Sequence, residues 1–355
     1  MKVRPREVRA TFAHTSDGPV LQPAPIDSVV GVRFGRGSPV AKLRAAGRRH
    51  RPLITVLGSV ATAAALALVL AGRGDEFAQA LARASVGVLA VTALLQIVAL
   101  LARSEAWHLT IRAAGGTVAR RVLFRASSMQ VLGGMINGHL GVAARIAALR
   151  RSSPEVSPQV PTLIAAEFPI IAIEGALAAL ASFTLIAPLG LPWWLPLILL
   201  AVVGAASAGL RHLALRRGRD LWKGLAVLRS ASRGRRVVAF VLVAVFAQIF
   251  RNWILLQAVG VDASLFDATA VLIALVTLSQ LPIGPGVGAA AAVLILGGDG
   301  VAAAAAAGVL MTATGTIGGL CFAAWAGADK LWAVNRKTDH VVASRHPPGR
   351  ATHAL

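Results

Sequence analysis

The stretch RGRRVVAFVLVAVFAQIFRNWILLQAV, residues 233–259, decides the class of fold. A cluster of arginines is followed at once by an apolar run that is long enough to cross a hydrocarbon core of about 30 Å. The run predicts a membrane-spanning helix over residues 237–259. Arg251 lies well inside this run, beside Asn252. A charge at that depth is costly unless it faces a partner or a cavity, so Arg251 is a candidate functional residue.

The composition of the whole chain agrees with a membrane location. The 355 residues are 56% hydrophobic and 14% charged, and the mean hydropathy of +0.70 lies far on the apolar side of soluble proteins. The formal net charge of +21 would suggest nucleic acid in a soluble protein. Here the basic residues gather in tails and loops, and no nucleic-acid-binding motif accompanies them. We therefore expect membrane topology and contact with anionic lipid, and no nucleic acid, to account for this charge.

Both ends of the chain are predicted to be basic cytoplasmic tails. Residues 1–52 are rich in Arg, Pro, Gly and Ser without apolar periodicity, and residues 334–355 are also basic. Such segments cannot bury enough apolar surface to fold, so we expect both to be disordered. One transmembrane domain is expected between them, over residues 53–333.

About six spanning helices are predicted within this domain. They cover residues 53–71, 86–102, 160–187, 193–210, 237–259 and 301–326. A cleaved signal peptide is the alternative for the first of them, because residues 78–80 loosely fit a cleavage site. The long preceding tail and the length of the apolar run favour a retained anchor.

The distribution of charge predicts the orientation. The loop between the fourth and fifth spans is the most basic one, so the positive-inside rule places it in the cytoplasm. The connector after the fifth span carries Asp262 and Asp267 without Lys or Arg, which fits the outer face. We therefore expect a multi-pass protein of the cell (inner) membrane with both termini cytoplasmic.

Two further apolar segments are interrupted in the middle. Residues 124–149 contain GGMINGHLG at 133–141 and have basic flanks at both ends, which predicts a re-entrant hairpin that enters from the cytoplasm. Residues 266–296 contain PIGPGVG at 282–288. Its prolines remove backbone donors and its glycines permit a tight turn, so we expect a second hairpin, entering from outside.

The two interruptions define the expected fold class. Irregular backbone at membrane depth persists only where protein or a water-filled cavity satisfies its polar groups. The expected fold is therefore an all-α polytopic membrane protein, with about six spanning helices and two re-entrant hairpins of opposed orientation that suggest an inverted repeat around a polar site. The alternative is that the glycine clusters are ordinary loops, or close-packing glycines between two full spans.

Several charged residues lie within the apolar zone. Glu167 and Glu174 are seven residues apart in the third predicted span and so share a helix face. One account pairs Arg251 with one of these glutamates. The other account has Arg251 and Arg145 bind a headgroup phosphate while the glutamates hold an amine or carry protons. Arg103 is expected to snorkel at the interface, with headgroup binding as its alternative.

No catalytic constellation can be assembled from the sequence. The single cysteine, Cys321, lies in an apolar run and excludes a disulfide framework. The histidines show no metal-ligand spacing, and neither a Ser-His-Asp set nor a phosphate-cradling loop is found. We therefore expect no enzyme activity and no cofactor.

Three stretches together resemble a known family. Arg103-Ser-Glu-Ala-Trp107 and Asn137-Gly-His-Leu-Gly141-Val-Ala-Ala-Arg145 resemble the Arg-x-x-x-Trp and Asn-x-x-x-Pro-Gly-x-x-Gly-x-x-x-Arg regions of the lysylphosphatidylglycerol synthase transmembrane family, whose members are often described as flippase-like. Leu281-Pro-Ile-Gly-Pro-Gly-Val-Gly288 is similar to its second Pro-Gly-Gly turn. The resemblance covers about residues 52–333. The first turn lacks the family's proline, and alanines at 289–292 replace a glutamate that usually follows the second turn.

The resemblance implies a lipid-translocating or lipid-binding role. We expect no aminoacyl transferase domain, since only a short basic tail follows the last span. The expected function is a flippase-like translocase that binds or moves an anionic phospholipid or a polyprenyl-linked glycolipid. The alternative is a non-transporting accessory subunit, partnered with an enzyme of cell-envelope lipid or glycan synthesis. The candidate lipid-binding residues are Arg103, Asn137, Arg145, Glu167, Glu174, Arg251, Gly284, Pro285, Gly286 and Gly288.

Overall fold

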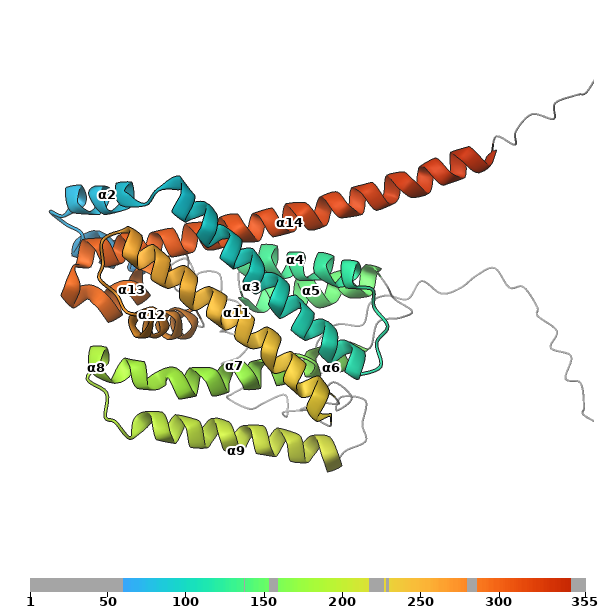
Figure 1. The fold of residues 1–355 in the computed structure, drawn as a ribbon, viewed down its shortest axis with the longest axis horizontal. Coiled ribbons are helices and arrows are strands. Elements are labelled where there is room, and N and C mark those ends of the chain that lie inside the picture. Colours follow the sequence, from blue (N-terminus) through green and yellow to red (C-terminus); the bar gives the residue numbers. More distant parts are fainter. Residues whose placement is uncertain are drawn as a thin grey trace, which may run out of the picture. The chain divides into compact units, whose positions relative to one another are not determined.

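The computed structural model describes residues 60–136, 138–152, 159–216, 227, 230–279 and 286–345, and every regular element within these ranges is a helix (Figure 1). An apolar helical segment at Val60–Val69 precedes the labelled helices. These are α2 (Gly74–Arg83), α3 (Val86–Ala113), α4 (Arg120–Ile136), α5 (Gly138–Ser152), α6 (Val160–Ala165), α7 (Phe168–Ala181), η2 (Ser182–Leu185), α8 (Ile186–Leu189), α9 (Leu195–Arg216), α11 (Ala231–Ala258), α12 (Leu265–Leu278), α13 (Val287–Leu296), η5 (Gly297–Asp299) and α14 (Val301–Arg345).

Four helical stretches are long and apolar enough to cross a membrane. They are Val86–Ala113, Val160–Leu189, Ala231–Ala258 and Val301–Ala328. Large apolar side chains lie exposed on all four of them, including Leu94, Leu180, Phe246 and Ile317. Exposing apolar side chains to water is unfavourable in free energy, so these surfaces fit a lipid environment. The prediction of an all-α polytopic membrane protein is confirmed.

The four long stretches coincide with four of the six predicted spans. The remaining two predicted spans correspond to shorter apolar helices, Val60–Val69 and Leu195–Gly209. The first of these is described only from residue 60 onward. The second is the apolar part of α9, whose last turns contain Arg211 and Arg216. The predicted third span is also less regular than expected, because a turn at residues 166–167 separates α6 from α7.

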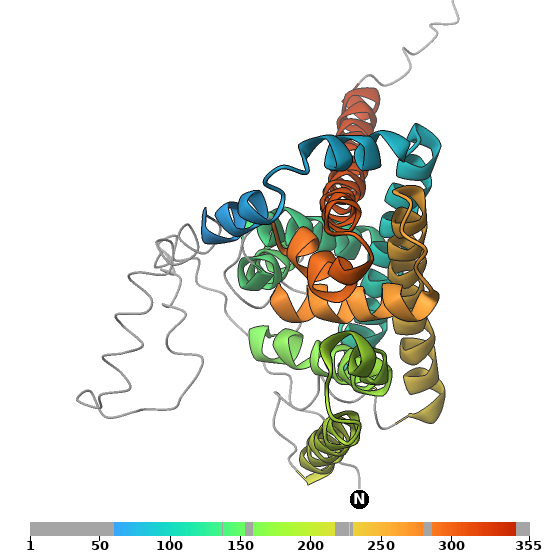
Figure 2. The ribbon, with the colours of Figure 1, turned by 90° about the vertical axis from the view of Figure 1, so that its left-hand side faces the viewer.

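The central pair of helices is α3 and α11, which lie side by side in both views (Figures 1 and 2). They run antiparallel, since Arg83, just before α3, donates a hydrogen bond to the carbonyl oxygen of Val259, just after α11. Alanines dominate their contact, with Ala99 and Ala102 packed against Ala244 and Ala247. Small side chains let two membrane helices approach closely.

Each central helix is followed by a helical hairpin. Helices α4 and α5 pack against each other after α3, and α12 and α13 do so after α11. A Cβ atom on Gly141 would lie 2.6 Å from the carbonyl oxygen of Gln130, so only glycine permits this approach of α5 to α4. Two similar units on antiparallel helices are the arrangement expected of an inverted repeat. The side of the membrane from which each hairpin enters stays a prediction.

Helix α14 joins the two units. It packs on α2, α3, α4, α11 and α13. Glycines bring it close to its neighbours: Gly308 meets the backbone of Gly288 in α13, and a Cβ on Gly318 would lie 2.8 Å from the carbonyl oxygen of Ala93 in α3. Besides the alanine contact between α3 and α11, the described apolar core has one cluster around α11 to α14 and another around α3 to α7.

Candidate functional site

The most deeply buried charge in the second cluster is Arg145. Its residue is 1% exposed and its guanidinium carbon lies 3.8 Å from the centroid of the Trp107 ring. Helix α5 presents Arg145 and α3 presents Trp107, which is also fully buried. A planar guanidinium stacks well on an indole face, where the ring quadrupole attracts the positive charge.

Glu167 supplies the counter-charge of Arg145. The two side chains form an ion pair. Glu167 lies at the turn between α6 and α7, where Pro169 occupies an early position of α7. The helical hydrogen-bond ladder is interrupted there, and this interruption places the carboxylate beside a neighbouring helix. The sequence identified both residues but did not pair them with each other.

A second ion pair lies next to the first. Arg103 Nη2 of α3 donates to Glu174 Oε2 of α7 at 2.9 Å, and both side chains are partly exposed. Arg103 and Glu174 lie close enough to Arg145 to act on it electrostatically. Glu167 at the start of α7 and Glu174 within it thus both meet arginines of the same site, although the sequence predicted neither pairing. Arg103, expected to snorkel, is held by a carboxylate.

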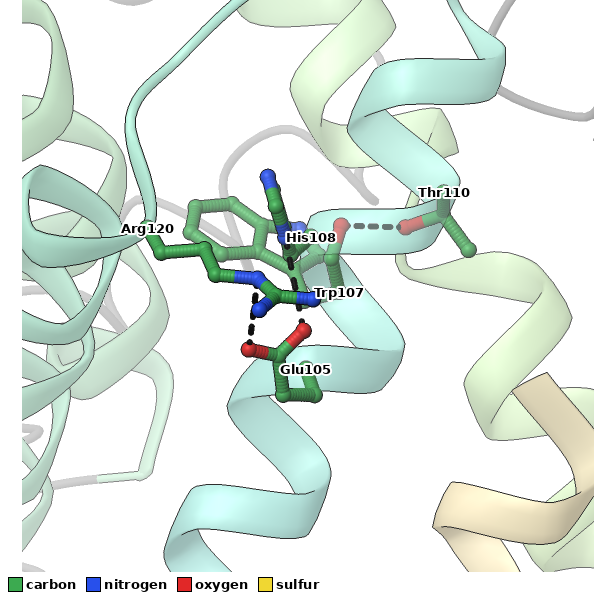
Figure 3. A network of polar contacts seen from close by, with 5 residues as sticks. All are labelled: Glu105, Trp107, His108, Thr110 and Arg120. Carbon is green, nitrogen blue, oxygen red and sulfur yellow. Dashed lines mark hydrogen bonds and ion pairs between the residues drawn. The ribbon is translucent and has the colours of Figure 1, made fainter. Parts of the chain in front are cut away.

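A third group of charges continues the site along α3 and α4. Glu105 Oε1 accepts from Arg120 Nε at 3.1 Å, and Glu105 Oε2 lies 3.4 Å from His108 Nδ1 (Figure 3). Figure 3 also shows the Trp107 ring beside this network, and Thr110 donates to the Trp107 carbonyl oxygen at 2.8 Å. The sequence did not select Glu105 or Arg120 as site residues. Glu105 could have been found from the polar half of α3 after Ala102, which follows an otherwise apolar run.

Three donors in this site are buried without an acceptor in the structure: Arg103 Nε, Trp107 Nε1 and Arg145 Nε. Each would lose free energy if it stayed unsatisfied in an apolar interior. All three belong to side chains that surround the Arg145 guanidinium or lie beside it. A group rich in hydrogen-bond acceptors, such as a phosphate or an ester carbonyl, has the complementary chemistry.

Arg251 lies in a different place from Arg145. It contacts the oxygen of Gln96 on α3, which also accepts from Gln248 Nε2 at 2.8 Å. At a rise of about 1.5 Å per residue, Gln96 and Trp107 are about 16 Å apart along α3. Of the two accounts of Arg251, the one that pairs it with a glutamate is therefore wrong, because Glu167 and Glu174 are engaged by Arg145 and Arg103.

The remaining predicted site residues divide into two groups. Asn137, Gly284 and Pro285 lie outside the described residues. Gly286 precedes α13, and its α-carbon lies so near Thr62 that a Cβ would be 2.9 Å from the Thr62 methyl carbon. Gly288 is buried against Gly308. Both glycines are thus positions of close helix packing, which was the alternative to a binding turn.

The described residues contain no group of three His, Cys, Asp or Glu side chains arranged to hold a metal ion.

The fold and the site together define a class of protein: an all-α polytopic membrane protein with buried, mostly paired charges between its helices. Comparison with known proteins adds no identity, because no family model, curated protein or solved structure matches the chain.

Proposed function

We propose that this protein binds an anionic phospholipid or a polyprenyl-linked glycolipid and moves its headgroup across the cell membrane. The observation that carries the proposal is the Arg145 site: a fully buried guanidinium stacked on Trp107, surrounded by buried donors that lack acceptors. The resemblance of residues 103–107 and 137–145 to the lysylphosphatidylglycerol synthase transmembrane family points to the same class of ligand.

The ion pairs suggest how a headgroup could enter. Arg145–Glu167 and Arg103–Glu174 join α5 and α3 to the α6–α7 segment. A phosphate can replace a carboxylate as the partner of a guanidinium because both accept two parallel N–H bonds. Displacing Glu167 from Arg145 would loosen the α6–α7 segment, which is already interrupted at that residue. Ligand binding and helix movement would then be coupled.

A reconstitution experiment tests the proposal. The full chain is placed in liposomes containing a fluorescent phosphatidylglycerol, and dithionite bleaching measures its movement between leaflets. We expect faster exchange than in protein-free liposomes, and a loss of at least about tenfold in Arg145→Gln, since a charge-assisted contact is removed.

Arg150→Gln is the matched control, because Arg150 is exposed near the end of the same helix. Equal exchange rates for wild type and Arg145→Gln would contradict the site assignment. Absence of exchange together with a stably co-purifying biosynthetic enzyme would favour the accessory-subunit alternative.

A further inference from the structure

Arg251 occupies a second polar site inside the bundle. It lies on α11, is 5% exposed, and is surrounded by amide side chains, namely Gln96 of α3 and Gln248 and Asn252 of α11. Gln96 lies near the middle of the apolar run 86–102 that opens α3. The guanidinium therefore lies at a depth where lipid tails surround the helices.

The site differs from the Arg145 site in its charge. Arg145, Arg103 and Arg120 each meet a carboxylate. Arg251 meets only neutral oxygens, those of Gln96 and Asn252, and none of the carboxylates in the described ranges forms an ion pair with it. A cation held this deep without a counter-charge is unfavourable, so its retention calls for an anionic partner.

Hydrogen-bond donors in this site also exceed the acceptors. Arg251 Nε and Asn252 Nδ2 are buried and have no acceptor in the structure. The Gln96 oxygen is already shared between Arg251 and Gln248. An added ligand must therefore bring both negative charge and several acceptor atoms, which describes a tetrahedral oxyanion bound by a guanidinium fork.

A glycine of α14 packs closely against the guanidinium. A Cβ atom on Gly315 would lie 3.2 Å from Arg251 Nη1 and 3.9 Å from Nη2. Any larger side chain at this position would crowd the charged end of Arg251. The third helix around the site thus approaches the guanidinium closely through a glycine, whereas the first two helices contribute polar atoms.

We propose that Arg251, Asn252, Gln96 and Gln248 form a second oxyanion site, at mid-membrane depth, which binds a phosphate group. It is separate from the Arg145 site, about 16 Å away along α3 by helix rise. The phosphate belongs either to a lipid headgroup or to the free ion. The inference does not depend on lipid translocation, since the uncompensated charge needs its partner in either case.

The test measures ligand-induced stabilisation of the full chain in a phosphate-free maltoside detergent. The unfolding temperature is recorded with inorganic phosphate, with phosphatidylglycerol and with uncharged diacylglycerol as a blank, for wild type, Arg251→Gln and the control Arg150→Gln. We expect at least one phosphate probe to stabilise wild type and Arg150→Gln, and this stabilisation to be reduced in Arg251→Gln. Stabilisation by phosphatidylglycerol alone identifies a headgroup, and stabilisation by inorganic phosphate identifies the free ion.

The unfolding temperature of Arg251→Gln without ligand is a second measurement that tests the proposal. Without ligand, Arg251→Gln should unfold at the same or a higher temperature than wild type, because an uncompensated buried charge is gone. A lower unfolding temperature with unchanged ligand stabilisation would show that Arg251 only holds Gln96 in place, and would overturn the proposal. Equal stabilisation of wild type and Arg251→Gln by both probes would overturn it as well.

Gly315→Ala tests the same site with the charge retained. We expect it to weaken phosphate binding severalfold because the added methyl group crowds the guanidinium. Gly327→Ala is the matched control on α14, since a Cβ there meets nothing within 4 Å. Equal binding by the two glycine variants would contradict the placement of the anion beside Gly315.

Discussion

At the scale of single residues, the protein keeps charges inside an apolar bundle by two different means. Arg145 is neutralised by Glu167 and shielded by the Trp107 ring. Arg251 is surrounded by amides instead. Breaking a buried ion pair leaves an uncompensated charge, whereas removing both partners does not. The two sites should therefore respond in opposite ways to the loss of a charge.

Glu167→Gln should destabilise the protein strongly. It leaves Arg145 buried without a counter-charge, at a cost of about 3–5 kcal/mol. The double variant Arg145→Gln/Glu167→Gln should recover most of that loss. Thermal unfolding in detergent, followed by tryptophan fluorescence, measures both. Glu105→Gln serves as the control, since its partner Arg120 is largely exposed and such pairs contribute about 1 kcal/mol or less. A double variant no more stable than Glu167→Gln would contradict this account.

The residue scale is also where sequence reasoning succeeded and failed most clearly. Arg145, Glu167, Glu174 and Arg251 could be selected because charges are rare in apolar segments. Their partners could not be assigned, because helix periodicity gives the face of a residue but not the neighbouring helix. Gln96 was missed for a related reason: a single neutral amide barely lowers the hydropathy of its span.

At the scale of elements, glycines determine how closely the hairpins pack. The approach of α5 to α4 at Gly141, and of α13 to α14 at Gly288 and Gly308, leaves no space for a side chain. The sequence predicted both interruptions from glycine and proline content, and the structure has a helix on each side of each interruption. It predicted less well which glycines form turns, because Gly286 and Gly288 pack against helices.

Gly141→Ala and Gly134→Ala form a matched pair within the first hairpin. Alanine favours a helix over glycine by about 1 kcal/mol, so Gly134→Ala, where a Cβ meets nothing within 4 Å, should be neutral or stabilising. Gly141→Ala should lower the unfolding temperature by several degrees, because its methyl group would overlap the Gln130 carbonyl. Equal unfolding temperatures for the two variants would argue against the described packing of α4 on α5.

At the scale of the whole molecule, the antiparallel α3–α11 pair fixes which loops share a side. The segment after α3 and the segment after α11 must lie at opposite ends of the bundle. Charge alone predicted the same alternation. It could not predict the break within the third span, which lies at the turn just before Pro169.

Cysteine labelling tests the predicted orientation. In a Cys321→Ser background, Asp262→Cys should react with a membrane-impermeant maleimide on intact cells, whereas Thr117→Cys should react only after permeabilisation. Both positions are exposed in the loops that follow α11 and α3. Labelling of Thr117→Cys alone on intact cells would invert the predicted orientation, and labelling of both would contradict the antiparallel pair.

The contacts of α14 also bear on the order in which the protein is assembled. This 45-residue helix follows the others along the chain, yet it packs on both the α3–α4 unit and α13. During synthesis α3 and α11 leave the ribosome well before α14. The faces that α14 later covers, including Arg251 beside Gly315, therefore lie uncovered until α14 has been made. A ribosome that stalls before residue 301 would leave a chain whose polar interior meets lipid, which makes it a natural substrate for membrane quality-control proteases.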